Sequence, residues 1–396
     1  MKLSIRDLSV TAKKVLMRVD FNVPMNKQGA IADDTRIRAA LKTIHYALDQ
    51  GASVILMSHL GRPKAGFDPA LSLAPIAKRL SELLGRPVQM APDCVGPKVE
   101  ELVKRLGPGE VLLLENLRFH PGEEHPEREP QFALALAKLG DLYVDDAFGA
   151  AHREHTSVTN LARLFSHKAA MGFLMEEELR ELGLLLEHPK RPYYAIMGGA
   201  KISTKIGVIR NLLKSVDALF LGGGMTYTFL KAAGGSVGDS IVEDDQLELA
   251  RALMRESVKP LYMPKDLVIA TKCEAGARTK TILIKEPIPS GWQGVDVGPQ
   301  TIQEWGQILQ GAATIFWNGP VGVVEIAEFA QGTQALARQL AALSAAHIVI
   351  GGGDSVAAIE KMGLSNQFDH LSTGGGAALE FLEFGTLPGA EALSDR

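Results

Sequence analysis

The chain has 396 residues, of which 46% are hydrophobic and 22% are charged, and its formal net charge is -4 at pH 7. This composition is typical of a well-packed globular protein, and the length is too great for one ordinary core, so two domains are expected. The slightly acidic balance excludes a general basic field for nucleic acid or an acidic membrane, so an anion site has to be a local patch.

Cysteine content and the start of the chain indicate the compartment. Cys94 and Cys273 are far apart in sequence and fit no CxxC or Cys/His metal spacing, so neither a disulfide framework nor a zinc site is predicted. Residues 1–10 lack the apolar stretch of a signal peptide, and no uncharged run approaches the ~20 residues that a membrane helix needs. A cytoplasmic protein is therefore expected, with no nucleic acid and no membrane among its partners.

In the first half, short apolar runs alternate with amphipathic stretches, a pattern typical of parallel strands joined by helices. Residues 33–35 (Asp-Asp-Thr) are expected to cap a helix that runs to about residue 49. Helical spacing recurs over residues 73–84, and Gly85 is expected to end that helix. The predicted strands are residues 15–19, 53–58, 88–91, 111–115 and 142–145.

A helix is predicted between the two halves. Residues 173–187 have leucines along one helical face and glutamates in the first turn, and His188-Pro189 ends the pattern. We expect this helix to join two domains and to act as a hinge. The expected domains are residues 1–172 and 188–382, with the helix between them.

The second half repeats the alternation, so the predicted fold class is α/β, with a mostly parallel, doubly wound sheet flanked by helices in each domain. All but one of its strands run soon into a loop that is rich in glycine or contains Asn-Gly. Ligands of open parallel sheets bind beyond the carboxyl ends of the strands, where such loops lie. The predicted strands are residues 194–197, 218–221, 267–270 (the exception), 314–317, 347–350 and 370–372.

The loops after the strands of the first half are rich in cationic side chains. A single arginine in such a loop more often makes a surface ion pair, but a set at one sheet edge favours a carboxylate or phosphate ligand. Asp20 and Asn22 add acceptors, so a small phosphorylated hydroxy acid is predicted. No nucleophile motif surrounds His59 or His152, and neither is predicted to be a general base. The set comprises Arg18, Asp20, Asn22, Arg36, Arg38, His59, Arg62, Arg118, Asp146, His152 and Arg153.

Glycine-rich loops dominate the second half. Residues 198–205 (GGAKISTK) place a glycine pair after a strand and two lysines, Lys201 and Lys205, four apart on a predicted helix, which favours a phosphate site. Neither GxGxxG nor Walker A spacing is present, and one glycine triplet alone is equally consistent with a tight turn, so the prediction rests on the group. Asp354 is interpreted either as a Mg²⁺ ligand or as the N-cap of a helix starting near Val356. The triplets are residues 222–224, 351–353 and 374–376.

Motifs along the whole chain then point to a family. RVDFNVP at Arg18, SHLGRPK at Ser58, GGAKISTK at Gly198, WNGPVGVVE at Trp317 and GGGDS at Gly351 occur in that order. With DDTRIRAAL, ENLRF, DAFGAAHREH, LGGGMTYTFL and STGGGA between or after them, they resemble the phosphoglycerate kinase family from beginning to end. The resemblance implies reversible phosphoryl transfer from 1,3-bisphosphoglycerate to ADP, giving 3-phosphoglycerate and Mg-ATP, in glycolysis and gluconeogenesis.

The resemblance also implies roles for individual residues, with Glu325 at the ribose, Asp354 as the Mg²⁺ ligand, and a segment near 383–396 that returns to the first domain. Substrate-binding residues would be Asp20, Phe21, Asn22, Arg36, His59, Leu60, Gly61, Arg62, Arg118 and Arg153. Nucleotide-binding residues would be Lys205, Gly222, Gly223, Gly224, Gly294, Asn318, Glu325, Gly351, Gly352, Gly353, Asp354 and Ser355. Catalytic residues would be Arg36, Lys201, Lys205 and Gly375, with phosphate bound at the helix start formed by Gly374, Gly375 and Gly376.

The chemistry implied by this resemblance agrees with the absence of a predicted base. In the ATP-consuming direction the attacking carboxylate is already ionised, so alignment, charge stabilisation and hinge closure that excludes water are the expected requirements. Two positions depart from the family pattern: Asp145 replaces the usual asparagine, and Ser355 replaces the usual threonine but keeps a hydroxyl. A monomer is the default expectation.

Two alternative functions are weighed against the kinase. An NAD-dependent dehydrogenase shares the two-domain α/β plan, but the GxGxxG fingerprint is missing. A nucleotide-binding scaffold on a degenerate kinase fold is expected to lose charged site residues, whereas Arg36, Lys201, Lys205 and Asp354 are all present.

Overall fold

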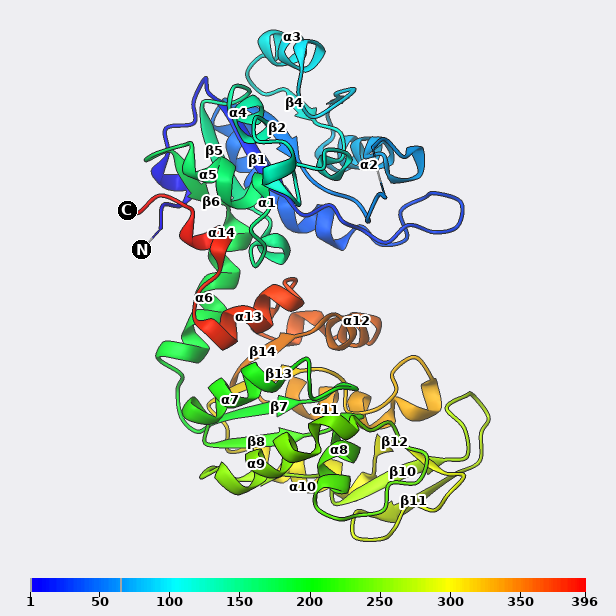
Figure 1. Cartoon of the computed structure of the whole chain (residues 1–396). Coiled ribbons are helices and arrows are strands. Elements are labelled where there is room, and N and C mark those ends of the chain that lie inside the picture. The colour runs from blue at the N-terminus through cyan, green and yellow to red at the C-terminus, as the bar shows by residue number, and fades with distance from the viewer. Residues whose placement is uncertain (1, 65) are drawn as a thin grey trace. The chain divides into compact units, whose positions relative to one another are not determined.

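The computed structural model describes residues 2–64 and 66–396, which form two compact units (Figure 1). Unit 1 comprises Met1–Arg180 and Thr386–Arg396, and unit 2 comprises Glu181–Gly385. Within the described part of the chain, every helix is too short or too polar to cross a bilayer.

Unit 1 is built on a six-stranded sheet in the order β3-β4-β2-β1-β5-β6, in which all neighbours are parallel. Every residue of β2, β4 and β5 is buried, as expected for strands covered on both faces. The carboxyl ends of the strands therefore meet at one edge, where the loops of the candidate site begin. The strands are β1 (Lys14–Val19), β2 (Ser53–Met57), β3 (Val88–Met90), β4 (Val111–Leu113), β5 (Leu142–Asp146) and β6 (Ala169–Met171).

Helices cover both faces of this sheet. Val15, Met17 and Val19 of β1 pack in one core cluster with α1 and α2, while Leu16 packs in a second cluster with α3, α4 and α5. Alternate side chains of one strand thus enter opposite layers, which is the pattern of a doubly wound domain. The helices are α1 (Thr35–Asp49), α2 (Ala74–Leu84), α3 (Pro97–Arg105), α4 (Phe132–Ala137), α5 (Leu161–Arg163) and α14 (Pro388–Glu391).

The C-terminal segment belongs to unit 1. Leu3 donates from its backbone N–H to the Ser394 carbonyl at 2.9 Å, and Leu393 is buried in the second core cluster. Helix α6 (Phe173–Glu187) carries residues of both units, since the division falls between Arg180 and Glu181.

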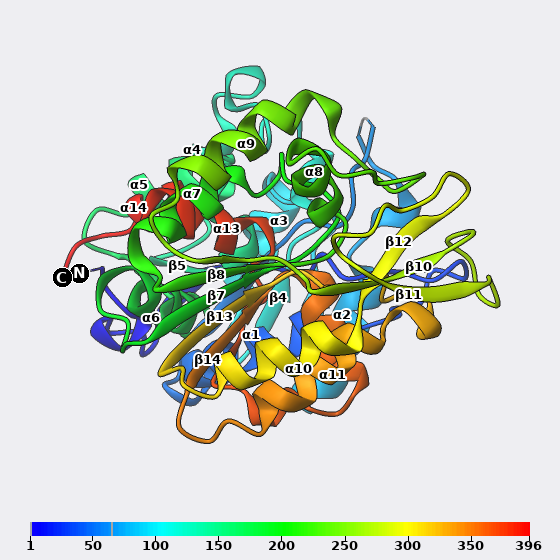
Figure 2. The same ribbon diagram turned by 90° about the horizontal axis from the view of Figure 1, so that it is seen from below.

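Unit 2 contains a second six-stranded parallel sheet, in the order β15-β14-β13-β7-β8-β9. Helices α7, α8 and α9 lie on one side of it and α10 and α11 on the other (Figure 2). The strands are β7 (Tyr193–Met197), β8 (Ala218–Leu221), β9 (Leu261–Tyr262), β13 (Thr314–Asn318), β14 (His347–Gly351) and β15 (His370–Leu371). The helices are α7 (Ile206–Ser215), α8 (Met225–Ala232), α9 (Leu247–Glu256), α10 (Pro299–Leu309), α11 (Gln331–Ala341), α12 (Gly353–Lys361) and α13 (Gly376–Phe384).

One strand prediction in unit 2 needs correction. A strand was expected at residues 267–270, and β10 (Asp266–Ala270) forms there, but it lies in a separate antiparallel sheet with β11 (Thr279–Leu283) and β12 (Gln293–Val297). The sequence analysis missed β9, β11 and β12. The first three residues of β11 are exposed and polar, so it lacks the apolar run that reveals a buried parallel strand.

Candidate functional site

In unit 1, a guanidinium joins the loop after β1 to the start of α1. Arg36 Nη1 donates to Asp20 Oδ2 at 2.9 Å and to the Asn22 carbonyl at 3.2 Å. Asn22 Oδ1 in turn accepts from the Gly61 N–H at 2.9 Å, which ties in the loop after β2. Because β1 and β2 are parallel neighbours, these loops leave the same sheet edge. Four residues predicted from sequence are therefore brought together.

His59 is held as a hydrogen-bond donor. Its ring is buried, and Nδ1 lies 3.0 Å from Nη2 of Arg18, which can only donate. Burial, followed by the charges of Arg18 and Arg118, holds the pKa of His59 well below its usual value, so the imidazole is neutral. With Nδ1 as acceptor, the proton resides on Nε2. His59 can therefore donate to an anion, and it has no free lone pair with which to act as a base.

Arg118 and Arg153 lie close enough to His59 to lower its pKa, and Arg62 follows Gly61 in the same loop. Arg118 is buried, donates from Nη1 to the Gly61 carbonyl at 2.6 Å and pairs through Nη2 with Glu124 at 2.9 Å, while its Nε has no hydrogen-bond partner among the described residues. Burial lowers the pKa of Arg118, Glu124 opposes this shift, and Arg153 and Arg18 add to it. Arg62 is exposed and Arg153 half-buried. Cations this close favour an anionic ligand.

Two of the residues predicted for the site in unit 1, Arg18 and Asp146, are engaged within the protein instead. Arg18 is fully buried and donates to the Ser157 hydroxyl and the Val19 carbonyl. Its third contact, with His59 Nδ1, orients the histidine ring. Asp146 is the last residue of β5, and its Oδ1 accepts from the backbone N–H groups of Leu174 and Met175 at 2.9 and 3.3 Å. It anchors the start of α6, because a carboxylate there satisfies amides that lack helical partners.

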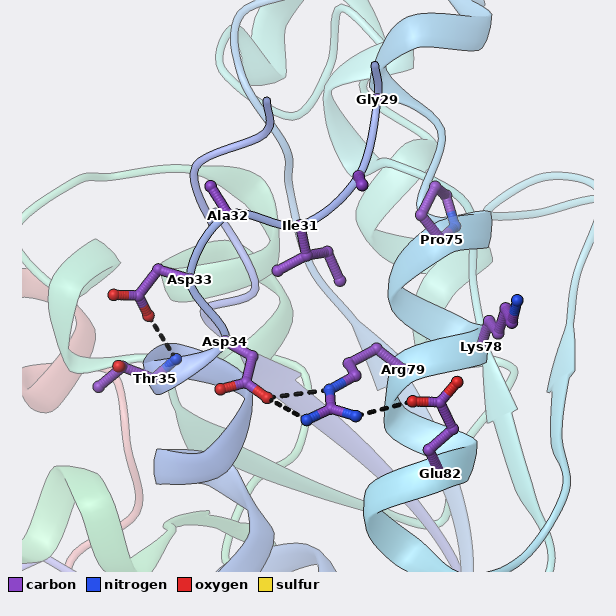
Figure 3. A pocket seen from close by; sticks show the side chains of 11 residues that line it. Gly29, Ile31, Ala32, Asp33, Asp34, Thr35, Pro75, Lys78, Arg79 and Glu82 are labelled. Carbon is purple, nitrogen blue, oxygen red and sulfur yellow. Dashed lines mark hydrogen bonds and ion pairs between the residues drawn. The ribbon is translucent and has the colours of Figure 1, made fainter. Parts of the chain in front are cut away.

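Ion pairs hold the start of α1. Arg79 donates to Asp34 Oδ2 from Nε and Nη2 at 2.9 and 2.8 Å and from Nη1 to Glu82 at 2.7 Å, beside an open pocket of about 690 Å³ (Figure 3). Asp34 Oδ1 also accepts from Arg38 at 2.8 Å. Arg38 therefore pairs with the N-cap residue of its own helix. Asp34 occupies the N-cap without a capping bond, and the acceptor for the Thr35 N–H is Asp33.

In unit 2, Lys205 is half-buried and its ammonium group is surrounded by oxygen atoms. Its Nζ donates to Asn318 Oδ1 at 2.6 Å, to the Gly198 carbonyl at 2.7 Å and to the Asn318 carbonyl at 3.2 Å. Burial lowers the pKa of Lys205 to about 8, an effect that the charge of Asp354 partly offsets. The prediction that Lys201 and Lys205 lie on a helix is wrong, since both precede α7, which begins at Ile206. Lys201 is exposed in this turn.

Glycines form the walls of a cavity of about 330 Å³ in unit 2. Gly223 has φ +68°, and a Cβ there would lie 2.6 Å from the Gly199 nitrogen, so the two loops approach too closely for any side chain. The cavity lining includes Gly199, Gly223, Gly224, Gly294, Glu325 and Asp354, which unites members of four separately predicted segments. Apolar residues of the lining, including Ile241 and Val321, suit the flat face of a base.

Two helices begin at the other glycine triplets. Helix α12 starts at Gly353 with Gly352 as its N-cap, so the expected start near Val356 is wrong and Asp354 is not the cap. Asp354 lies in the first turn, is exposed and lines the cavity. Helix α13 starts at Gly376, with Gly375 as its N-cap at φ +52°. Unpaired amides at such helix starts attract anions.

Two supporting residues in unit 2 escaped the sequence analysis. Tyr227 is buried behind Gly294, where a Cβ would meet its hydroxyl at 2.0 Å. Asp296 accepts from the Gly332 and Val297 N–H groups at 2.7 and 2.9 Å and fills the space beside Gly322, in the loop that leads to Glu325. Both act by packing against a glycine, which leaves no signal in a single sequence.

Comparisons with known proteins give one consistent result. The family model described as phosphoglycerate kinase matches residues 5–384. Curated phosphoglycerate kinases of Chlamydia trachomatis serovar L2 and Moorella thermoacetica are 54% and 53% identical to this chain, covering 99% and 100% of it and 98% and 100% of their own lengths. The solved phosphoglycerate kinases of Coxiella burnetii and Pyrococcus horikoshii OT3 superpose with TM-scores of 0.87 and 0.86 at 39% and 33% identity, each comparison covering 99% of this chain and 98% of the other.

Proposed function

The chain belongs to the phosphoglycerate kinase family, and from this premise we propose how its residues carry out the reaction. It is a kinase that transfers phosphate to the carboxyl group of 3-phosphoglycerate, and in the glycolytic direction it returns that phosphate from 1,3-bisphosphoglycerate to ADP. The dehydrogenase and scaffold alternatives have no support in the comparisons. The observation that carries the proposal is the separation of two chemistries: a cationic sheet edge in unit 1 and a glycine-walled cavity in unit 2.

We assign the phosphoglycerate to unit 1. Arg36, Arg62, Arg118 and Arg153 would neutralise its phosphate and carboxylate groups, since guanidinium forks bind both in two-point fashion. His59 would donate from Nε2. The carboxylate of Asp20 and the amide of Asn22 would receive the substrate hydroxyl, with Phe21, Leu60 and Gly61 forming the adjoining backbone.

We assign the nucleotide to unit 2. The base would lie against Gly222, Gly223, Gly224 and Gly294, with Glu325 at the ribose hydroxyls. The phosphates would meet Lys205, Asn318, the amides that open α12 at Gly351, Gly352, Gly353 and Ser355, and those that open α13 at Gly374, Gly375 and Gly376. Asn318 Nδ2 is buried without a hydrogen-bond partner among the described residues, which supports this role because a bound phosphate oxygen would satisfy it.

Charge stabilisation at the transferred group would fall to Arg36, Lys201, Lys205 and the amide of Gly375. The attacking carboxylate is ionised at neutral pH, so no residue has to remove a proton. Arg36 belongs to unit 1 and the other three to unit 2. We therefore propose that α6, which carries residues of both units, is the hinge for a closure that excludes water from the labile acyl phosphate.

The residues also fit Mg²⁺. Asp354 is an exposed carboxylate in the first turn of α12 and lines the same cavity as the nucleotide glycines. Mg²⁺ binds through one carboxylate, phosphate oxygens and water, and when bound it neutralises phosphate charge. Asp354 would hold the ion.

We further propose a cytoplasmic monomer whose partners are its small-molecule substrates. Two free cysteines in the described chain fit a reducing compartment.

The test is turnover of the purified protein with Mg-ATP and 3-phosphoglycerate, with hydroxylamine present to trap the acyl phosphate while ADP release is followed. Substrate-dependent ADP release and trapped product, both lost on removing Mg²⁺, are expected. Nucleotide binding without turnover would overturn the proposal.

A further inference from the structure

A cluster of metal-type donors lies in unit 1, apart from the residues assigned to either substrate. The loop after β3 presents Asp93 and Cys94, and His120 follows the short helix Leu117–Phe119 after β4. One donor atom from each of these residues lies within 4.8 Å of the other two. His120 Nε2 is 2.7 Å from Asp93 Oδ1, and the buried Sγ of Cys94 points to the Glu115 carbonyl at 3.0 Å.

The imidazole of His120 is oriented from its far side. Nδ1 lies 3.0 Å from Glu129 Oε1, and Glu129 Oε2 accepts from the Gly122 N–H at 3.3 Å. The ring also stacks on Phe132, with centroids 4.5 Å apart and planes inclined by 14°. A carboxylate on one imidazole nitrogen fixes the tautomer and leaves the other nitrogen to a metal, which is the usual arrangement around histidine ligands. Here that other nitrogen faces Asp93 and Cys94.

We propose that Asp93, Cys94 and His120 form a binding site for one Zn²⁺ ion, with Glu129 as the carboxylate that orients His120. A thiolate, an imidazole and a carboxylate are the three donor types that Zn²⁺ uses in proteins, and water would complete a tetrahedron. Mg²⁺, the ion of the kinase reaction, is a hard cation that prefers oxygen ligands. The thiolate and the imidazole therefore select against it. The expectation that the cysteines fit no zinc site considered only sequence spacing, and the fold brings His120 to Cys94 across β4.

Binding has a defined proton balance. Zn²⁺ would displace the thiol proton of Cys94, which now points to the Glu115 carbonyl, and the Nε2 proton of His120 where that nitrogen is protonated. The Nδ1 proton would stay on the Glu129 side. The ion would tie the loop after β3 to the segment that begins at His120, so metal binding should stabilise unit 1 without any part in phosphoryl transfer.

The experiment is titration of chelator-treated full-length protein with Co²⁺, a tetrahedral zinc substitute whose thiolate charge-transfer absorption reports sulfur coordination, followed by displacement with Zn²⁺. Buffer lacks Mg²⁺ and nucleotide. Wild type and Cys273→Ser, the matched control at the other cysteine, should show the band at one equivalent of Co²⁺ and lose it with Zn²⁺. Cys94→Ser should lack it. Glu129→Gln should weaken affinity about 10- to 100-fold.

His120→Gln guards against a folding defect in Cys94→Ser, since it leaves the buried sulfur in place and should also lack one-equivalent binding. Unchanged kinase activity in Mg²⁺ would show that Cys94→Ser, His120→Gln and Glu129→Gln are folded. An unchanged thermal unfolding midpoint would show it for Cys273→Ser, because Cys273 lines the nucleotide cavity. The proposal is overturned if wild type shows no band at one equivalent, if the band survives in Cys94→Ser, or if it disappears in Cys273→Ser. A failure would leave the kinase assignment intact, because turnover is measured without added Zn²⁺.

Discussion

Lys205 Nζ lies 2.6 Å from Asn318 Oδ1, and Lys205 is half-buried directly before α7. Asn318 is the last residue of β13, and Lys205 lies in the segment after β7, the parallel neighbour of β13. Two carbonyl oxygens complete the acceptors of the ammonium group. This cation is thus already oriented when a nucleotide phosphate arrives, but burial makes its charge sensitive to pH.

The pH dependence of ADP use follows from that burial. Burial lowers the pKa of Lys205 to about 8 from 10.5, so the ammonium loses its proton, and its attraction for phosphate, as pH rises through about 8. We expect kcat/KM for ADP to fall above about pH 8, and kcat to fall only at higher pH, because bound phosphate raises the pKa of Lys205. Lys205→Met should have a lower kcat/KM without this break, and a break retained in Lys205→Met would assign it to another group.

The lowered pKa of Lys205 also makes the free energy of unfolding depend on pH. Between about pH 8 and 10.5 the unfolded chain binds a proton at Lys205 that the folded chain does not. The free energy of unfolding of wild type relative to Lys205→Met should therefore rise as pH increases over this window and fall as pH decreases through it. Urea denaturation at several pH values measures the difference.

Lys201 should contribute to chemistry more than to binding. It is exposed, precedes α7, and is proposed to meet the transferred group only when the substrates are aligned. Lys201→Ala should lower kcat by about 10²- to 10³-fold, the effect of removing one preorganised charge donor, with little change in the calorimetric Kd for ADP. Lys214→Ala, which removes an exposed lysine from α7, is the control. An unchanged kcat would remove Lys201 from the mechanism.

Most strands of the parallel sheets could be predicted because they are buried on both faces and therefore read as apolar runs, whereas the short strands β6 and β9 were missed. The loops that follow them could be located for the same reason, which is how Asp20 and Asn22 were found, with Arg36 at the start of the next helix. Gly61, which the structure places with them, came only from the family resemblance. Strand β11 could not be found in this way, because its exposed side chains leave only a polar segment.

Directions of side chains were harder to predict than positions of loops. Asp146 is the last residue of β5 and the first of DAFG, yet its carboxylate accepts from the amides that open α6. Arg18 lies in β1 among buried residues, so its guanidinium stays inside the unit and contacts His59 Nδ1 at 3.0 Å. The turn that carries Lys201 and Lys205 was mistaken for helix because a spacing of four fits both, and only the backbone after Gly199 distinguishes them.

Asp145 should make unit 1 less stable as pH rises. It is fully buried, its Oδ1 accepts from the Ala147 N–H at 2.9 Å, and its Oδ2 has no hydrogen-bond partner among the described residues. Burial raises the pKa of Asp145 to about 7, above its ordinary 3.8, so the stability linked to its proton is fully present below about pH 3.8 and is lost as pH rises from there through about 7.

Asp145→Asn keeps the shape and removes the charge. Its unfolding free energy should exceed that of wild type by on the order of 4 kcal/mol at pH 8, and the advantage should shrink as pH falls and vanish only near about pH 4. Asp49→Asn, an exposed carboxylate at the end of α1, is the control. Parallel pH curves for wild type and Asp145→Asn would contradict the prediction.

Arg79 should affect phosphoglycerate binding without touching it. It holds Asp34 at the start of α1 (Figure 3), two residues before Arg36. Arg79→Gln should raise KM for 3-phosphoglycerate with a smaller change in kcat, because the helix start that orients Arg36 loosens. Arg105→Gln, which removes a surface pair with Glu101 on α3, should change neither. If both variants have the same KM for 3-phosphoglycerate, Arg79 does not help to orient Arg36.

The close approach of Gly199 and Gly223 can be tested with glycines of matched backbone conformation. Gly223 and Gly234 both have positive φ, +68° and +88°, but a Cβ at Gly234 meets nothing within 4 Å, whereas one at Gly223 would lie 2.6 Å from the Gly199 nitrogen and 2.8 Å from the Pro320 carbonyl.

Gly234→Ala should therefore cost only the left-handed backbone strain, about 1–2 kcal/mol. Gly223→Ala should cost a further ~1–3 kcal/mol, because backbone atoms must move apart to admit the methyl group. That movement also opens the cavity wall, so Gly223→Ala should lose ADP affinity while Gly234→Ala keeps it. Urea denaturation and calorimetry measure the two effects. Equal losses of stability with unchanged ADP binding would show that the contact between the two glycine loops does not shape the nucleotide cavity.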